Sequence, residues 1–244
     1  MKLLLKSLRD HLKYRIKPGP IQGPVHIIAS PFKTGTTSVG KSLIALGVGQ
    51  RDMQHNHALL RTTLPAARYY RKKLRGVSDF RAFEAAEKDK VLKRFAPLVV
   101  AARQFDVFHD APMGHTHLHP FVRKIIAPEA RFIWVNRDSE EWLESVRNWE
   151  ISHPEVYPLH GRWETNPEAC RANRMKLWNR SYRAFNALAD TFPEHCLELQ
   201  WSDLSSYSAL AEFYGVPEPK DAFPHANASK SAPQSPDSGL PSED

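Results

Sequence analysis

The stretch of sequence that decides the fold is VHIIASPFKTGTTSVGKS, residues 25–42. It opens with an apolar run that contains β-branched residues and stops abruptly at a loop of glycine, threonine, serine and lysine. When a buried parallel strand is followed by such a loop, the backbone N–H groups of the loop and of the next helix N-terminus can bind an anion. The sequence therefore predicts an α/β fold with an anion-binding loop after its first strand.

Two registers of this loop compete. In the first, residues 35–42 fit GxxxxGK[ST], the Walker A loop of ATP- and GTP-binding proteins, with Lys41 on the phosphates and Ser42 on magnesium. In the second, the loop is residues 30–37 and Lys33 is the cation that faces the phosphate. A Walker loop turns at its first glycine almost as soon as the strand ends, but five residues intervene here. We favour the second register, and a P-loop kinase or NTPase is the alternative.

A second apolar strand is expected within FDVFHDAP, residues 105–112. Its polar end would lie where ligands gather, at the carboxyl edge of an open α/β sheet. Asp110 at that edge could take a proton from an attacking hydroxyl if the carboxylate lies within hydrogen-bond reach. A helix cap or a salt bridge is the structural alternative for Asp110. His109 is the neighbouring candidate for the base, but the alternation of a strand directs it to the opposite face.

A third strand is expected at RFIWVN, residues 131–136, followed by a turn and a helix with Ser139 as its N-cap. Arg137 at the strand end and Ser145 eight residues later would converge on one phosphate if the helix starts directly. A Walker B strand would end in an acidic residue, whereas this one ends in Asn136. This segment therefore argues against an ATPase.

Together, these segments resemble the PAPS-dependent sulfotransferases, which have the P-loop sulfotransferase fold. The loop SPFKTGTT is similar to their 5'-phosphosulfate-binding loop, with Phe32 inserted before the lysine. Asp110 matches the position of their general base, and Arg137 with Ser145 matches their 3'-phosphate contacts. The segment FPHAN, residues 223–227, is similar to one that closes their nucleotide site.

The resemblance implies a three-layer sandwich with a central, mainly parallel, five-stranded sheet. It implies transfer of a sulfuryl group from PAPS, 3'-phosphoadenosine 5'-phosphosulfate, to a hydroxyl or amine, with no metal required. Lys33 and Asp110 would be catalytic. The implied donor-binding residues are Lys33, Thr34, Gly35, Thr36, Thr37, Ser38, Arg137 and Ser145.

On this basis the chain divides into a basic N-terminal helix or arm (1–20), a sulfotransferase-like P-loop domain (21–230) and a Pro/Ser-rich, disordered tail (231–244). No stretch is long and apolar enough to span a membrane, although the arm could touch an anionic membrane surface. Residues 50–104 and 151–166 are expected to shape the acceptor pocket. A small molecule, a carbohydrate or a lipid could occupy it, and the oligomeric state is not indicated.

The net charge of +7 is concentrated in residues 61–103, which contain twelve Lys or Arg and four Asp or Glu. No nucleic-acid-binding module accompanies this basic region, so we predict no nucleic-acid partner. Two cysteines form neither a disulfide framework nor a metal site, which favours a reducing, cytoplasmic location. The run HTHLH, residues 115–119, lacks a carboxylate or cysteine spaced to complete a metal site, and we interpret it as a polar loop near the acceptor.

Overall fold

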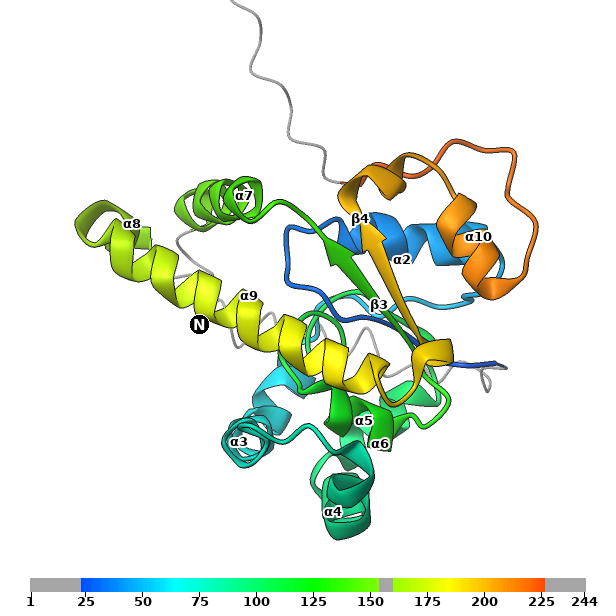
Figure 1. The fold of residues 1–244 in the computed structure, drawn as a ribbon, viewed down its shortest axis with the longest axis horizontal. Coiled ribbons are helices and arrows are strands. Elements are labelled where there is room, and N and C mark those ends of the chain that lie inside the picture. The colour runs from blue at the N-terminus through cyan, green and yellow to red at the C-terminus, as the bar shows by residue number, and fades with distance from the viewer. Residues whose placement is uncertain (1–22, 154–159, 227–244) are drawn as a thin grey trace, which may run out of the picture.

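A computed structural model of the chain describes residues 23–153 and 160–226. Its centre is a parallel sheet of four strands in the order β2-β1-β3-β4 (Figure 1). The strands are β1 (His26–Ile28), β2 (Val107–Phe108), β3 (Arg131–Asn136) and β4 (Cys196–Gln200). The α/β class and the parallel sheet are confirmed. The described residues form four strands where five were expected, because the long connections β1 to β2 and β3 to β4 are helical.

The side chains of the sheet alternate between two buried clusters. Ile27 pairs in register with Phe108 and Phe132, and these three residues belong to the larger cluster. Ile28 and Ile133 pair in the next register and belong to the smaller cluster. Both faces of the sheet are therefore apolar, as expected for parallel strands that helices cover on two sides.

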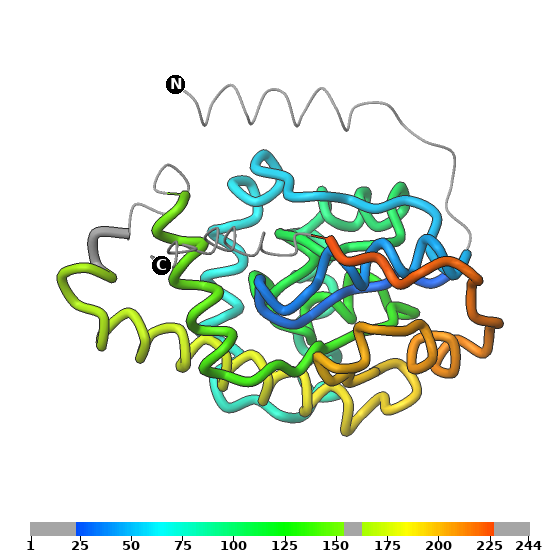
Figure 2. The backbone as a smooth tube through the Cα atoms, turned by 90° about the horizontal axis from the view of Figure 1, so that it is seen from above, coloured from blue at the N-terminus to red at the C-terminus, as the bar shows by residue number. Residues whose placement is uncertain are grey.

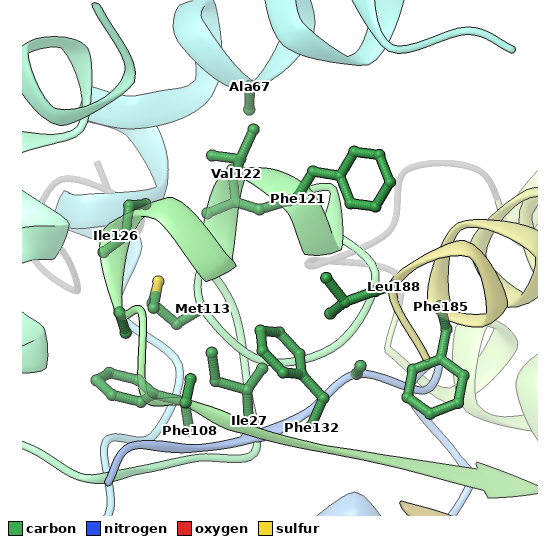
Figure 3. Packing of buried hydrophobic residues seen from close by; sticks show 14 of the residues in the cluster. Ile27, Ala67, Phe108, Met113, Phe121, Val122, Ile126, Phe132, Phe185 and Leu188 are labelled. Carbon is green, nitrogen blue, oxygen red and sulfur yellow. The ribbon is translucent and has the colours of Figure 1, made fainter. Parts of the chain in front are cut away.

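One face of the sheet is covered by α2 (Thr36–Ala45) and α10 (Ser208–Tyr214) (Figure 1). The other face packs against helices from the rest of the chain, and Figure 3 shows Phe121 and Val122 of α6 above the strand residues. The helices that contribute to this cluster are α3 (His57–Lys73), α4 (Phe80–Arg94), α5 (Ala96–Ala102), α6 (Pro120–Ile126), α7 (Ser139–Ser152), α8 (His160–Thr165) and α9 (Pro167–Ala189). This is the three-layer arrangement that was predicted.

One helix boundary differs from the sequence-based expectation. Asp138 caps α7, not Ser139, because its Oδ1 accepts the backbone N–H groups of Glu140 and Glu141 at 3.0 Å each. The helix still starts directly after β3, so the expected relation of Arg137 to the first turns of α7 is kept. The basic region lies in three helices, α3, α4 and α5; α4 ends at Arg94 with Phe95 as its C-cap, and α5 has a proline in its first turn.

Part of the basic region has a structural role. Glu87 of α4 is buried, and Lys73 and Lys90 donate to its carboxylate at 2.7 and 3.0 Å. The hydroxyl of Tyr70 donates to the same carboxylate at 3.2 Å, and the hydrogen bond from Lys73 is the largest cause that lowers the pKa of Glu87, to about 2. Lys73 of α3 therefore holds that helix against α4, while Lys90 pairs with Glu87 within α4.

Several predictions fall outside the described residues. They are the N-terminal arm (1–20), the tail (231–244) and the middle of the expected acceptor loop, residues 154–159. Within the described ranges, no helix is both long and apolar enough to cross a membrane.

Candidate active site

The loop from Ser30 to Thr37 connects β1 to α2, as the second register predicts. Lys33 and Gly35 both have positive φ angles, 67° and 78°, and Gly35 is the N-cap of α2. Left-handed residues in a tight loop of this kind create anion-binding concavities of backbone N–H groups. A Cβ on Gly35 would lie 2.6 Å from Cδ1 of Leu204 and 3.0 Å from the ring of Trp201, so only glycine fits here.

A cavity of about 440 Å³ opens at this loop. Its walls come from four separate segments, which are the loop with the start of α2, the β3–α7 junction, the turn after β4 and the end of the described chain. The lining residues are Lys33, Gly35, Thr36, Thr37, Ser38, Arg137, Ser145, Trp201, Ser202, Leu204, Ser205, His225 and Ala226. The volume suits a nucleotide-sized ligand.

The cavity gathers all but one of the residues expected to bind the donor. Thr34 is the exception, because it does not line the cavity and its side chain is fully buried. Its hydroxyl hydrogen-bonds to Pro31 O at 2.7 Å and to Ser30 Oγ at 2.9 Å. The Thr34 side chain therefore stabilises the conformation of the loop through these internal hydrogen bonds.

Arg137 connects the loop after β1 with the turn after β4, two of the segments that line the cavity. Its Nη1 donates to the carbonyl oxygen of Lys33 at 3.0 Å, and its guanidinium carbon lies 4.3 Å from the centroid of the Trp201 ring. The Lys33 ammonium is close enough that burial, first, and the Arg137 charge, second, lower its pKa. Glu141 contacts Arg137 at 3.5 Å, but its side chain is 62% exposed and screens little of this charge. Lys33, in the loop after β1, and Arg137, directly after β3, thus both line one cavity, and two cations in this arrangement could bind an anion.

The Walker register is not compatible with this geometry. Lys41 lies inside α2 and is exposed, away from the residues that line the cavity. Ser42 is buried, and its hydroxyl donates to the carbonyl of Ser38 at 2.8 Å within the helix. Neither side chain is available to a phosphate or a magnesium ion at the loop.

Asp110 and His109 point to different surroundings, as strand alternation predicts. His109 is buried, packs beside Gly40 and donates from Nε2 to Asp52 at 3.2 Å. Oδ1 of Asp110 accepts from the backbone N–H of Ala111 at 2.6 Å and from Nδ1 of His55 at 3.2 Å. These contacts make Asp110 the better candidate for a base.

The carboxylate of Asp110 is ionised and has one oxygen open. Burial, the largest cause, would raise its pKa, but the hydrogen bond from His55, the electrostatic contacts with the His115 and His55 rings and the N–H of Ala111 together outweigh burial and lower the pKa to about 2. Oδ2 has no hydrogen-bond or ion-pair partner among residues 23–153 and 160–226. Asp110 does not line the cavity, but His115 connects it to Thr36, which does.

Sequence reasoning missed several residues of the site. Trp201 and Leu204 follow β4 directly, in the short 3-10 helix η2 (Trp201–Ser205). Their position after a strand at the carboxyl edge was the available signal. His115 was assigned to a polar loop near the acceptor and given no role of its own. In the described part of the chain, no group of three or more His, Cys, Asp or Glu side chains could hold a metal ion.

The last described residues close the cavity on its remaining side. Figure 2 shows this segment, in red, beside β1 and α2 in blue. The backbone N–H of Ala226 donates to Ser38 Oγ at 3.0 Å, and His225 lines the cavity. A segment 188 residues away in sequence thus completes the loop region.

A family model described as a sulfotransferase domain matches residues 26–232. The chain belongs to this sulfotransferase family. It is therefore a transferase, and the match runs from β1 past the last residue of the cavity. No curated protein sequence matches this sulfotransferase. The family assignment agrees with the resemblance drawn from the loop, Asp110 and the Arg137–Ser145 pair, and it leaves the acceptor open.

Proposed function

We propose that this sulfotransferase moves a sulfuryl group from PAPS to a hydroxyl or amine of an acceptor. The observation that carries the proposal is the meeting of Lys33, Arg137 and Ser145 in one cavity. A donor with phosphate groups at both ends of its ribose needs two anion contacts at a fixed separation. Lys33 serves one end, and Arg137 with Ser145 serves the other.

Each part of the donor has a matching group in the proposal. The 5'-phosphosulfate lies in the loop, against Lys33 and the amides of residues 34–37. The 3'-phosphate lies against Arg137 and Ser145, where a guanidinium and a hydroxyl supply charge-assisted hydrogen bonds. Trp201 and Leu204 form an apolar wall for the adenine.

In the transfer, the acceptor oxygen or nitrogen forms a bond to sulfur while the bond between sulfur and the bridging oxygen breaks. The 5'-phosphate leaves with the electron pair of that bond, and Lys33 stabilises the negative charge that develops on it. The acceptor proton passes to Oδ2 of Asp110, the oxygen without a partner in the described residues. The step depends on positioning and electrostatics, so we propose no metal.

The acceptor class stays open among small molecules, carbohydrates and lipids. We propose that residues 50–104 contribute to its pocket, because His55 of this segment bonds to Asp110. A cytoplasmic location and the absence of a nucleic-acid partner remain predictions from composition.

A matched pair of lysine variants tests the proposed register. Turnover is measured as release of adenosine 3',5'-bisphosphate (PAP) from PAPS with a panel of hydroxyl and amine acceptors. Lys33→Ala should abolish turnover and leave PAP binding measurable by calorimetry, because Arg137 and Ser145 remain. Lys41→Ala changes an exposed lysine of α2, eight residues further along the chain, and should keep full activity. Unchanged turnover in Lys33→Ala, or loss in Lys41→Ala with a preference for magnesium-ATP, would refute the proposal.

A further inference from the structure

His115 lies between the donor loop and the proposed base. Its Nε2 is 3.1 Å from the hydroxyl of Thr36, the first residue of α2. Its Nδ1 is 3.5 Å from Oδ1 of Asp110. One imidazole therefore spans the two parts of the site that must act on the same sulfuryl transfer.

The chemistry of its partners assigns the tautomer of His115. A carboxylate can only accept, so the nitrogen that faces Asp110, Nδ1, carries the hydrogen. The hydroxyl of Thr36 can then donate to the bare Nε2. Neutral histidine suits this arrangement, and burial, the largest cause, lowers the pKa of His115 to about 4. The result is a directed chain from Thr36 through His115 to Asp110.

The backbone of His115 is fixed as firmly as its ring. Its φ angle is 54°, a left-handed conformation that non-glycine residues rarely adopt. The N–H donates to the carbonyl of Ile28, the last residue of β1, at 2.9 Å. The carbonyl accepts from Nη2 of the buried Arg123. Such a conformation persists only where the surroundings hold it, and it is common at functional sites.

The carboxylate of Asp110 is held on one side only. His55, His115 and the N–H of Ala111 all approach Oδ1, at 3.2, 3.5 and 2.6 Å. The same three contacts leave Oδ2 directed elsewhere. A carboxylate fixed through one oxygen presents the other to an acceptor in a single orientation.

We propose that His115 is a positioning residue that ties the donor loop to the base, so that Oδ2 of Asp110 keeps a fixed place relative to the bound sulfuryl group. The inference rests on the proposed function, because it assigns a role within the same transfer. His115 touches neither the donor nor the acceptor in this role. It acts through Thr36 on one side and Asp110 on the other.

Four ionisable side chains from three parts of the fold influence the pKa of His115. His109 and Asp110 follow β2, His55 lies before α3 and Arg123 belongs to α6. The Asp110 charge raises the pKa of His115, while the charges of the other three lower it. The ring therefore stays neutral near pH 7.

The tautomer is the first test, and it needs no turnover. Histidine ring nitrogens of the full-length protein are observed by ¹⁵N NMR near pH 7, and His115→Asn identifies the signal. Asparagine tolerates a left-handed backbone, so this variant should fold. We expect the Nδ1–H tautomer for His115. The Nε2–H tautomer would overturn the proposal, because no hydrogen would then face Asp110.

Kinetics supplies the second test. His115→Asn should lower kcat for PAP release roughly 100-fold, the scale of a misplaced catalytic group, and change the KM for PAPS little. In an Asp110→Asn background the same substitution should cost almost nothing further, because the two residues act as one unit. Additive losses would overturn the proposal, since a merely structural residue gives that result.

The matched control is His119→Asn, in the same loop. His119 is the N-cap of α6, where its Nδ1 accepts the N–H of Phe121, and asparagine is a good N-cap. This variant should keep kcat within about twofold, and an equal loss to that of His115→Asn would overturn the proposal. If the wild type does not turn over PAPS, the proposed function fails, and the positioning role of His115 fails with it. The tautomer of His115 would still report whether the ring connects Thr36 to Asp110.

Discussion

Arg137→Ala should remove the preference for a donor with a 3'-phosphate that we propose for this sulfotransferase. The Arg137 side chain is 17% exposed, and its guanidinium donates to the carbonyl of Lys33 and stacks on Trp201, so its position is fixed before a ligand binds. A charge-assisted hydrogen bond to a phosphate in such a site contributes about 1.5–3 kcal/mol. At about 1.4 kcal/mol for each tenfold change, this predicts a loss of roughly 10- to 150-fold in PAP affinity.

Two ligands separate this effect from a general disturbance of the loop. PAP carries the 3'-phosphate and adenosine 5'-monophosphate lacks it, and calorimetry measures both on each protein. Because Arg137 also holds the carbonyl of Lys33, Arg137→Ala should weaken both ligands to some extent, but PAP more strongly. The control is Arg147→Ala, which changes an exposed arginine of α7 that pairs with Glu144. An equal loss for both ligands in Arg137→Ala would refute the assignment of the 3'-phosphate to this residue.

Three further predictions concern stability. Gly35→Ala should lower the free energy of unfolding by at least about 1–2 kcal/mol, the cost of alanine in a left-handed conformation. The new Cβ would also overlap Leu204, and an unchanged urea midpoint would contradict this prediction. Glu87→Gln should cost about 1–3 kcal/mol by weakening buried hydrogen bonds between α3 and α4, and an unchanged melting temperature would refute that role. Burial lowers the pKa of His115 to about 4 and of His119 to about 3. Below pH 6.5 the unfolded chain therefore binds protons that the folded chain does not, so stability should fall from pH 7 to 5 by up to about 1.4 kcal/mol per pH unit for each histidine. Equal urea midpoints at pH 7 and 5 would contradict this.

The parts of the fold that sequence predicted are those set by local patterns. The strand, loop and helix of residues 25–42 follow one another directly, and so do β3, Arg137 and α7. In both cases a change from strand alternation or an apolar run to a helical pattern marks the boundary within a few residues. The spacing of Arg137 and Ser145 is local as well, which is why both could be assigned to one cavity before its shape was known.

The parts that sequence could not supply depend on contacts between distant segments. The second strand was expected within residues 105–112, but β2 is only two residues long. Asp106, at its start, is buried, and its carboxylate accepts the N–H groups of Gln50 and Arg51 at 2.8 and 2.7 Å. Secondary-structure propensity considers residues close in sequence. It therefore could not show that the Asp106 carboxylate holds residues 50–51, in the segment before α3, against β2.

His115 and Trp201 illustrate the same limit at the site. Each contacts a residue more than sixty positions away, Thr36 for His115 and Arg137 for Trp201. A histidine in a polar run and a tryptophan after a strand have many ordinary explanations. Only the assembled sheet edge, which brings the ends of the strands together, gives each of them a specific partner.

The inserted Phe32 shows how the loop and the β3–α7 junction become one unit. Its carbonyl accepts the indole N–H of Trp142 in α7 at 2.8 Å, and its ring packs 5.5 Å from that of Trp149. The next carbonyl, of Lys33, accepts from Arg137 at 3.0 Å. Two consecutive carbonyls of the loop are thus fixed to the segment that carries Arg137 and Ser145, the proposed second anion contact. The separation of the two contacts is therefore set by the protein before a ligand arrives, and such preorganisation favours a ligand with two anionic groups at that spacing over one with a single phosphate.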